Sequence, residues 1–278
     1  MDNKYSIGLV LVFIMLGSLA GCTTARMTRQ YASVVQYLYP AKTDPVDTPS
    51  IPVLSLPLKV GAAFVPEERS VNTTVFPEKE KIALLQEVST HFQRYPFVQS
   101  IELIPTAYLT PGGGFTNLDQ IRSLFGIEVI ALLSYDQVQF TDEGLLSLTY
   151  WTLVGAYIVT GEKNDTKTLM DVAVYHIPSR KLLFRAPGIS HVKGSATPVN
   201  LSEQLRRDSE KGFREAARDL VQNLQEQLKL FQERVKSAPQ EFRVTYKPGY
   251  TGGGSLDAWI VLLLIGMGGY TLWLHKQG

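Results

Sequence analysis

The sequence predicts an α/β fold: a mixed-sheet α/β sandwich with a long C-terminal covering helix, followed by a single transmembrane helix. Strand and helix patterns alternate between residues 58 and 128, and further strand patterns follow one another to residue 186. A single amphipathic pattern then runs from Asn200 to Lys236. The resulting element order, βαβαββββα, is typical of helices packed against a mixed sheet.

The first predicted elements form a βαβ unit behind an N-terminal lead. Ala25–Pro40 is predicted as a short helix, and the proline-punctuated segment Ala41–Pro57 as a tether. Leu58–Val65 has the short, mostly apolar character of a buried strand. Glu78–Tyr95 follows a proline and carries acidic residues in its first turn, so we expect an amphipathic helix. Phe97–Ile104 is predicted as the second strand.

The middle of the chain is predicted to be mostly strand. A short helix is expected at Asn117–Phe125, and Gly126 is placed to end it. Glu128–Phe140 begins apolar and ends in alternation, as expected for a central strand whose far end leaves the core. Further strands are predicted at Leu145–Thr160, Lys167–Ile177 and Lys181–Ala186. The turn Pro178-Ser179-Arg180 should join the last two as a hairpin.

The last element of the body is a long helix. From Asn200 to Lys236 the apolar residues are spaced almost throughout by three, four or eight positions, which places them on one helical face. Asn200 is predicted to cap the first turn, with Glu203 completing a capping box. We expect this helix to cover one face of the sheet. The alternative, a partner-binding coiled coil, is less consistent with a repeat that is not a clean heptad.

The N-terminus has the pattern of a bacterial secretory signal. Lys4 precedes an apolar stretch, Ile7–Leu16, and small residues follow. The run Leu19-Ala20-Gly21-Cys22 resembles the lipobox of bacterial lipoproteins. That resemblance implies cleavage after Gly21 by lipoprotein signal peptidase, and membrane lipid, as diacylglycerol and an N-acyl chain, on Cys22. The alternative is an ordinary signal anchor with an incidental thiol. Thr23 is not the aspartate of an inner-membrane retention signal, so the outer membrane is the expected destination.

The C-terminus has the pattern of a membrane span. Ala258–Leu274 is nearly continuously apolar, close to the lower limit for crossing a bilayer as a helix. Trp259 and Trp273 lie near its ends, where amphipathic rings favour the interface, and Lys276 follows. The positive-inside tendency places this short tail in the cytoplasm. The body would then lie in the periplasm, in agreement with the N-terminal signal.

A glycine-rich motif precedes this span. Gly252, Gly253, Gly254 and Ser255 have little capacity to hold helix or strand, which suits an intramembrane protease that needs an unwound substrate. Glycine pair, serine, apolar helix and basic end together resemble the GlyGly-CTERM tail recognised by rhombosortase, a rhomboid-type serine protease. Its basic end has one lysine and one histidine, fewer basic residues than that family usually carries. The alternative is a plain tail anchor with a glycine linker.

The pairing of a lipobox with this tail resembles the rhombotarget lipoproteins, a family whose name describes processing and implies no biochemical activity. Removal of the tail would leave the lipid as the only anchor. The predicted segments are a signal peptide (1–21), an acylated N-terminus with short helix and tether (22–57), a periplasmic α/β domain (58–236), a linker with the processing site (237–255) and a sorting tail (256–278).

Composition narrows the function of the body. The chain has 27 Lys and Arg against 26 Asp and Glu, which gives no concentrated basic charge for nucleic acid. Cys22 is the only cysteine, so no internal disulfide is expected. In layout the body resembles the periplasmic lipoprotein domains of the curli-secretion-component class, most suggestively at Asp171–Arg185. That resemblance carries no catalytic residues and implies docking or assembly at the envelope.

No motif predicts catalysis, a cofactor or a metal. His91, His176 and His191 have no HExxH or paired-ligand spacing, and Ser134, Ser147 and Ser190 have no GxSxG context. The glycines at 112–114 lack the lysine of a phosphate loop.

Two weaker patterns have ordinary structural alternatives. The cluster Asp136, Asp142 and Glu143 could bind a cation, but solvated turn carboxylates are more common. Tyr150-Trp151, with Tyr135 and Tyr157, could form a sugar platform, but core filling is the simpler use.

Two function classes therefore remain. The first is a non-enzymatic envelope lipoprotein that acts as a docking or assembly component, in a homo-oligomer or an envelope complex. The second is a hydrolase or binding protein for envelope polymers. A pocket with converging carboxylates or a Ser–His pair would favour an enzyme, whereas an exposed apolar strip would favour assembly.

Overall fold

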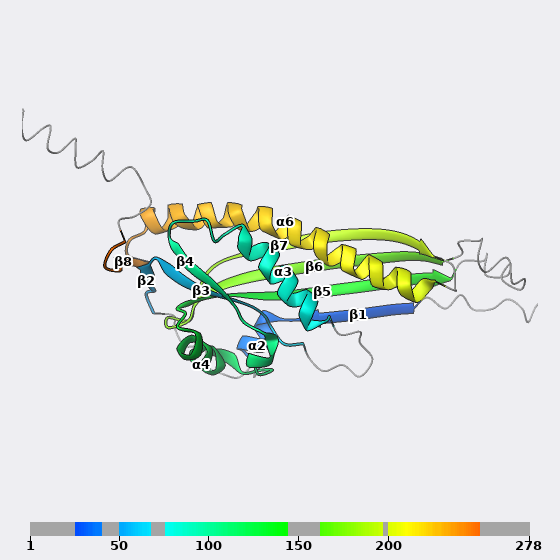
Figure 1. Cartoon of the computed structure of the whole chain (residues 1–278), viewed down its shortest axis with the longest axis horizontal. Helices are drawn as coiled ribbons and strands as arrows, with labels where there is room; N and C mark the ends of the chain where they lie inside the picture. Colours follow the sequence, from blue (N-terminus) through cyan, green and yellow to red (C-terminus); the bar gives the residue numbers. More distant parts are fainter. Residues whose placement is uncertain (1–25, 41–49, 68–75, 144–161, 197–199, 251–278) are drawn as a thin grey trace, which may run out of the picture.

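A six-stranded mixed sheet forms the centre of the computed structural model, which describes residues 26–40, 50–67, 76–143, 162–196 and 200–250 (Figure 1). Its strands are β1 (Arg26–Ala32), β3 (Leu58–Phe64), β4 (Val98–Leu103), β5 (Val129–Glu143), β6 (Glu162–His176) and β7 (Lys181–Ala196). Their order is β4-β3-β5-β6-β7, and β1 pairs with β5. The mixed α/β class predicted from the sequence is confirmed.

Strand β5 is the neighbour of three other strands. Its first part, Val129–Leu133, pairs in parallel with β3, and its second part, Tyr135–Thr141, pairs antiparallel with β1. On the other side β6 follows its whole length antiparallel, and β7 pairs antiparallel with β6. Strands β3 and β4 are parallel and are joined by α3 (Glu78–Thr90), which confirms the predicted βαβ unit.

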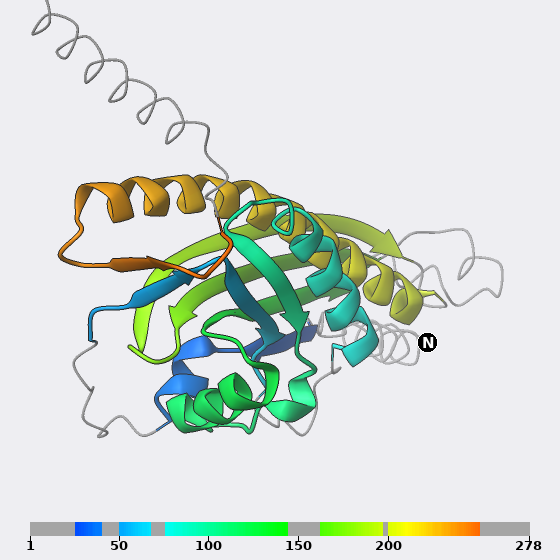
Figure 2. The same ribbon diagram turned by 60° about the vertical axis from the view of Figure 1, so that its left-hand side comes forward.

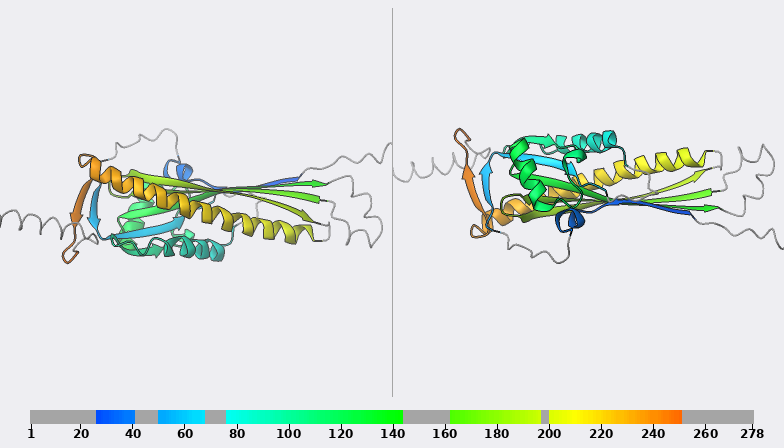
Figure 3. Two further views of the ribbon diagram at one scale, coloured as in Figure 1. Left: turned by 90° about the horizontal axis from the view of Figure 1, so that it is seen from above. Right: turned by 90° about the horizontal axis from the view of Figure 1, so that it is seen from below.

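Helices lie on both faces of the sheet (Figures 2 and 3). Besides α3 they are α2 (Val34–Leu38), the short 3-10 helix η1 (Thr106–Tyr108), α4 (Gly114–Phe125) and α6 (Leu201–Ser237). Helix α6 runs along β6 and β7, and α3 lies beside it over β3 and β4. On the opposite face α4 packs on β6, where the rings of Phe115 and Tyr175 meet edge to face at 5.9 Å. As predicted, α4 ends at Gly126, which adopts the left-handed conformation.

The long helix covers the sheet closely. A side chain at Gly188 of β7 would place its Cβ 2.2 Å from the carbonyl oxygen of Ala216 and 2.6 Å from the Leu220 backbone nitrogen. The helix therefore rests on the strand backbone itself. Nearby, Phe213 stacks on Phe76 with ring centroids 4.1 Å apart, and Tyr135 closes the cluster edge to face at 5.3 Å from Phe213. Tyr135 therefore fills the core, which is the simpler of the two uses that the sequence suggests for it.

The prediction of a helix over Ala25–Pro40 is wrong in its first half. Residues 26–32 form strand β1, and only Val34–Leu38 are helical, behind a Ser33 cap that accepts a hydrogen bond from the Gln36 backbone N–H at 3.4 Å. Pairing with β5 decides this, because alternate positions such as Gln30 face the interior, whereas Met27 is exposed. Tertiary pairing overrides the weak local preference of such a segment.

Two segments predicted to be irregular contain short strands. Strand β2 (Val53–Leu56), in the predicted tether, pairs in parallel with β8 (Arg243–Tyr246), in the predicted linker. Residues 41–49 of the tether lie outside the described part of the chain, as does the predicted strand Leu145–Thr160. Strand β7 is longer than predicted and extends to Ala196.

The long C-terminal helix is confirmed, but its predicted capping box is wrong. Asn200 occupies the N-cap position without a side-chain capping hydrogen bond. Glu203 instead accepts hydrogen bonds from Arg206 and Arg207, at 2.9 and 3.0 Å, and these guanidinium groups lower its pKa to about 2. A capping box would need the Glu203 carboxylate, which pairs with Arg206 and Arg207 instead.

The described chain begins and ends at opposite ends of an elongated body (Figures 1 and 3). Arg26 pairs with Thr141 at the end of the body where the long strands β5, β6 and β7 project. Strand β8 lies at the other end, beside the C-terminal end of α6. Within the described ranges, no helix has the length and apolar character needed to cross a bilayer. The predicted span Ala258–Leu274 falls outside those ranges.

Candidate functional site

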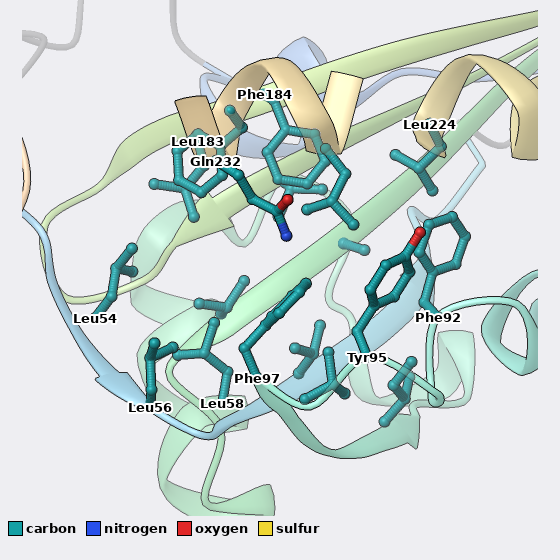
Figure 4. Close-up of a pocket in the computed structure, with 18 of the residues that line it drawn as sticks. Leu54, Leu56, Leu58, Phe92, Tyr95, Phe97, Leu183, Phe184, Leu224 and Gln232 are labelled. Carbon is teal, nitrogen blue, oxygen red and sulfur yellow. The ribbon is translucent and has the colours of Figure 1, made fainter. Parts of the chain in front are cut away.

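A cavity of about 760 Å³ lies between the sheet and the two helices α3 and α6 (Figure 4). Its floor is built by alternate side chains of the two central strands. These are Val129, Ala131 and Leu133 on β5, and Val172 and Val174 on β6. The residues between them, such as Ile130 and Leu132, are buried against the opposite face. The two-residue repeat of a strand thus supplies both an inner core and the cavity floor.

The walls come from the apolar faces of the two helices. On α6 they are Leu224, Leu228 and Phe231, which are spaced by four and three residues and therefore lie on one helical face. On α3, Leu85 and Val88 line the opposite wall, followed by Phe92 just after the helix. The apolar residues whose spacing predicts two amphipathic helices therefore line the cavity.

The rim is formed by segments that lie far apart in the sequence. Leu56 and Tyr246 belong to the paired strands β2 and β8, and Phe97 precedes β4. Tyr250, the last described residue, also lines the cavity. Leu56 and Phe97 are only partly buried, because they face open space instead of packed atoms.

Polar groups are few in this lining. Gln232 lies one turn of α6 before Lys236, and its amide is directed into the cavity, where the Tyr95 hydroxyl is also visible (Figure 4). Lys236 is exposed and is the only charged residue among the described residues of the lining. None of those residues is Asp, Glu, His or Cys, so the described lining offers no general base, carboxylate pair or thiol. The arrangement can hold an apolar group and orient a polar end at the rim.

A Ser–His pair exists elsewhere, in the hairpin between β6 and β7. The Ser179 hydroxyl lies 2.7 Å from Nδ1 of His176, and the Ser179 backbone N–H donates to the same nitrogen at 3.3 Å. Both side chains are buried, at 4% and 3% exposure, and burial lowers the pKa of His176. These contacts within its own turn hold the hairpin, and a buried hydroxyl cannot reach a substrate.

Three other residues considered for catalysis or cation binding make structural hydrogen bonds. Ser134 donates to the carbonyl oxygen of Asp171 at 3.4 Å, and Ser190 donates to that of Gly212 at 2.7 Å. The carboxylate of Asp136 pairs with Arg29 through hydrogen bonds of 2.8 and 2.6 Å. Residues 144–161, with Ser147, Tyr150, Trp151 and Tyr157, lie outside the described ranges. In the part of the chain that is described, no cluster of three metal-ligating residues occurs.

The predicted processing residues at both ends also lie outside the described ranges. They are Leu19, Ala20, Gly21 and Cys22 at the N-terminus, and Gly252, Gly253, Gly254, Ser255, Trp259, Trp273 and Lys276 at the C-terminus. Their expected roles therefore stay predictions. In the sequence, the glycine motif begins two residues after Tyr250, which lines the cavity.

Sequence reasoning did not find the cavity. The signals that could have contributed are the apolar faces of α3 and α6. The sequence predicts the first as an amphipathic helix and the second as a helix that covers the sheet. Comparison with known proteins adds no family: no protein-family model matches the chain, and no curated protein matches it.

Proposed function

We propose that this chain is a non-enzymatic cell-envelope lipoprotein, processed at both ends, whose body is a binding component that docks or assembles at the envelope. Cys22 would take its diacylglycerol from membrane lipid, and lipoprotein signal peptidase would cleave the bond between Gly21 and Cys22. A rhomboid-type protease, rhombosortase, would cut at Gly252–Ser255 and release the transmembrane helix. The mature protein would be held by lipid alone, in the outer membrane, with its body in the periplasm.

The cavity is the observation that carries the binding role. Its lining is apolar over the floor and both walls, and the described lining has no carboxylate pair of the kind that hydrolysis of a sugar polymer uses. The Ser–His pair at Ser179 and His176 is buried away from any opening. These features support binding over the alternative of an envelope-polymer hydrolase, which we do not favour.

Two separate pairs of exposed apolar residues support docking or assembly. On the side of the sheet that faces away from α6, Leu169 and Ile189 are paired neighbours with 43% and 63% exposure. Met27 and Phe140 form another exposed pair on β1 and β5, with 58% and 38% exposure. Exposed apolar neighbours mark interaction surfaces more often than single exposed residues do. A homo-oligomer or an envelope complex would cover them.

The geometry also gives tail removal a physical consequence. Helix α6 alone has 37 residues and spans about 55 Å. Cys22 lies four residues before Arg26, a reach of about 14 Å, and therefore anchors the end far from the cavity. Tyr250, six residues before the proposed tail in the sequence, lines the cavity. A precursor attached at both points would lie along the bilayer, and cleavage would free the cavity-bearing end.

Mass spectrometry of the protein purified from cells with and without a functional rhomboid-type protease tests the processing. We expect lipid on Cys22 in both strains, and loss of the residues after the glycine motif only where the protease is active. A tail retained in both strains would remove the processing proposal. A Cys22→Ser variant is the control for lipidation.

A further inference from the structure

We propose that the cavity binds one long aliphatic chain and that the acidic head group of this ligand lies at the rim beside Lys236. The inference rests on the proposed binding role and names the class of ligand. A free fatty acid and a single-chain phospholipid share this chemistry.

The lining selects an aliphatic ligand. The floor is made of valine, alanine and leucine side chains, and large apolar residues at the rim, Leu56, Leu58 and Phe97, are only partly buried. Apolar surface facing water is unfavourable in proportion to its area. A ligand without hydrogen-bonding groups along its length removes this surface from water and leaves no polar atom of its own unpaired.

The volume selects a single chain. At about 30 Å³ for each methylene group, a volume like that of a water molecule in the liquid, the 760 Å³ cavity holds on the order of 25 such groups. One chain of ordinary membrane length fits, whereas the two chains of a diacyl lipid do not. An α-helix about 10 Å wide fills about 400 Å³ in each turn. The apolar tail Ala258–Leu274 is therefore too large to be the occupant as a helix.

The rim selects an acidic head group. Lys236, in the last turn of α6, has no ion-pair partner among the described residues, and no carboxylate belongs to the described lining. Gln232 lies one turn earlier on the same helix and directs its amide into the cavity (Figure 4). An ammonium group and an amide donor at one opening complement a carboxylate or phosphate oxygen.

The chain is expected to come from a separate molecule. The lipid proposed for Cys22 would be attached at the opposite end of the body, within about 14 Å of Arg26. The cavity lining on α6 begins at Leu224, about 30 Å along the helix from Leu205, whose carbonyl oxygen accepts a hydrogen bond from Gln139 of β5. Because the lipid on Cys22 is proposed to lie in the membrane as the anchor, a separate molecule is the expected source of the chain in the cavity.

Photolabelling of the full chain in lipid nanodiscs tests the inference. The probe is hexadecanoate with a diazirine at its methyl end, and the labelled peptides are identified by mass spectrometry. We expect labelling of the floor and walls, around Val172 and Leu224, and competition by unlabelled hexadecanoate. Competition by a single-chain phospholipid as well would identify it as a second source of the same chemistry. Leu58→Trp, which narrows the rim, should reduce labelling at least fivefold, with Ile189→Trp on the opposite face as the matched control.

The head group is tested by Lys236→Gln, with Lys229→Gln on the same helix as control. Because a partly exposed ion pair contributes little, we expect competition by hexadecanoate to weaken about three- to fivefold, and competition by hexadecanol to stay unchanged. Equal weakening of both competitors would overturn the head-group assignment. Labelling confined to residues outside the cavity would overturn chain binding altogether. Displacement of the probe by a bulky aromatic compound but not by hexadecanoate would retain the proposed binding role and overturn the aliphatic inference.

Discussion

Replacement of Gly188 by alanine should weaken the contact between α6 and the sheet more than any other single added methyl group in that contact. The new Cβ would lie 2.2 Å from the carbonyl oxygen of Ala216 and 2.6 Å from the Leu220 Cβ and backbone nitrogen. These obstacles include helix backbone, which cannot rotate away as a long side chain can. The helix must therefore move by about 1 Å or more to restore van der Waals separation.

The size of the expected loss in unfolding free energy is taken from other proteins with overpacked cores. Inserted methylene groups in packed cores destabilise by about 1–3 kcal/mol, and contact with backbone places this variant at the upper end. For a domain of this size that loss lowers Tm by about 6–12 °C. The matched control is Ile189→Ala, the next residue on β7, which is 63% exposed on the other face and should change stability by less than about 0.5 kcal/mol.

Thermal and urea unfolding of the purified full chain, followed by circular dichroism, would measure both variants. Because α6 also forms one wall of the cavity, Gly188→Ala should reduce hexadecanoate labelling as well. An unchanged Tm for Gly188→Ala, or an equal loss for Ile189→Ala, would refute the close packing of helix on strand.

Three further outcomes are expected. Phe213→Ala, at the centre of the aromatic cluster, should lose about 3–5 kcal/mol in urea unfolding, against a negligible change for the exposed Leu230→Ala; comparable losses would contradict the cluster. Burial raises the pKa of Asp208 in the folded protein. Its contribution to folding stability is therefore fully present below the pKa of the unfolded chain and is lost as pH rises through the folded-state pKa. Asp208→Asn should thus gain stability over the parent with rising pH, and a constant difference in unfolding free energy would contradict this. Finally, if the precursor is attached at both ends as proposed, a spin label at the Lys193 position and one at the Gln240 position should lie equally close to the bilayer, and tail cleavage should move only the second away. Power-saturation measurements that show no change at Gln240 after cleavage would contradict the proposed attachment.

Local periodicity was sufficient to predict much of the fold. Leu58–Phe64, Glu78–Thr90 and Val98–Leu103 were predicted within a few residues, except at the helix end, because each element carries its own apolar pattern. The same holds for α6. Strand β1 was missed because its partner is distant: Arg29 pairs with Asp136, 107 positions later. No local pattern in the sequence encodes such a pairing.

The cavity was not predictable for a related reason. Its walls are two helices whose apolar faces could equally have packed against each other or fully against the sheet. Whether space remains between Val88 and Leu228 depends on the angle and distance at which α3 and α6 cross the strands. The β2–β8 pair, which brings Leu56 and Tyr246 to the rim, joins segments 190 positions apart. By contrast, the processing motifs are local by nature and could be proposed from the sequence.

The most direct test of the apolar binding site is the lipid content of the protein itself. Full chain purified from cells in detergent-free polymer discs would be immunoprecipitated, and the bound lipids quantified by mass spectrometry against the Leu58→Trp variant prepared in the same way. The expected result is enrichment of single-chain acidic lipid, near one molecule per protein, that is lost in the variant. Identical lipid profiles for the two proteins would contradict a ligand-binding cavity.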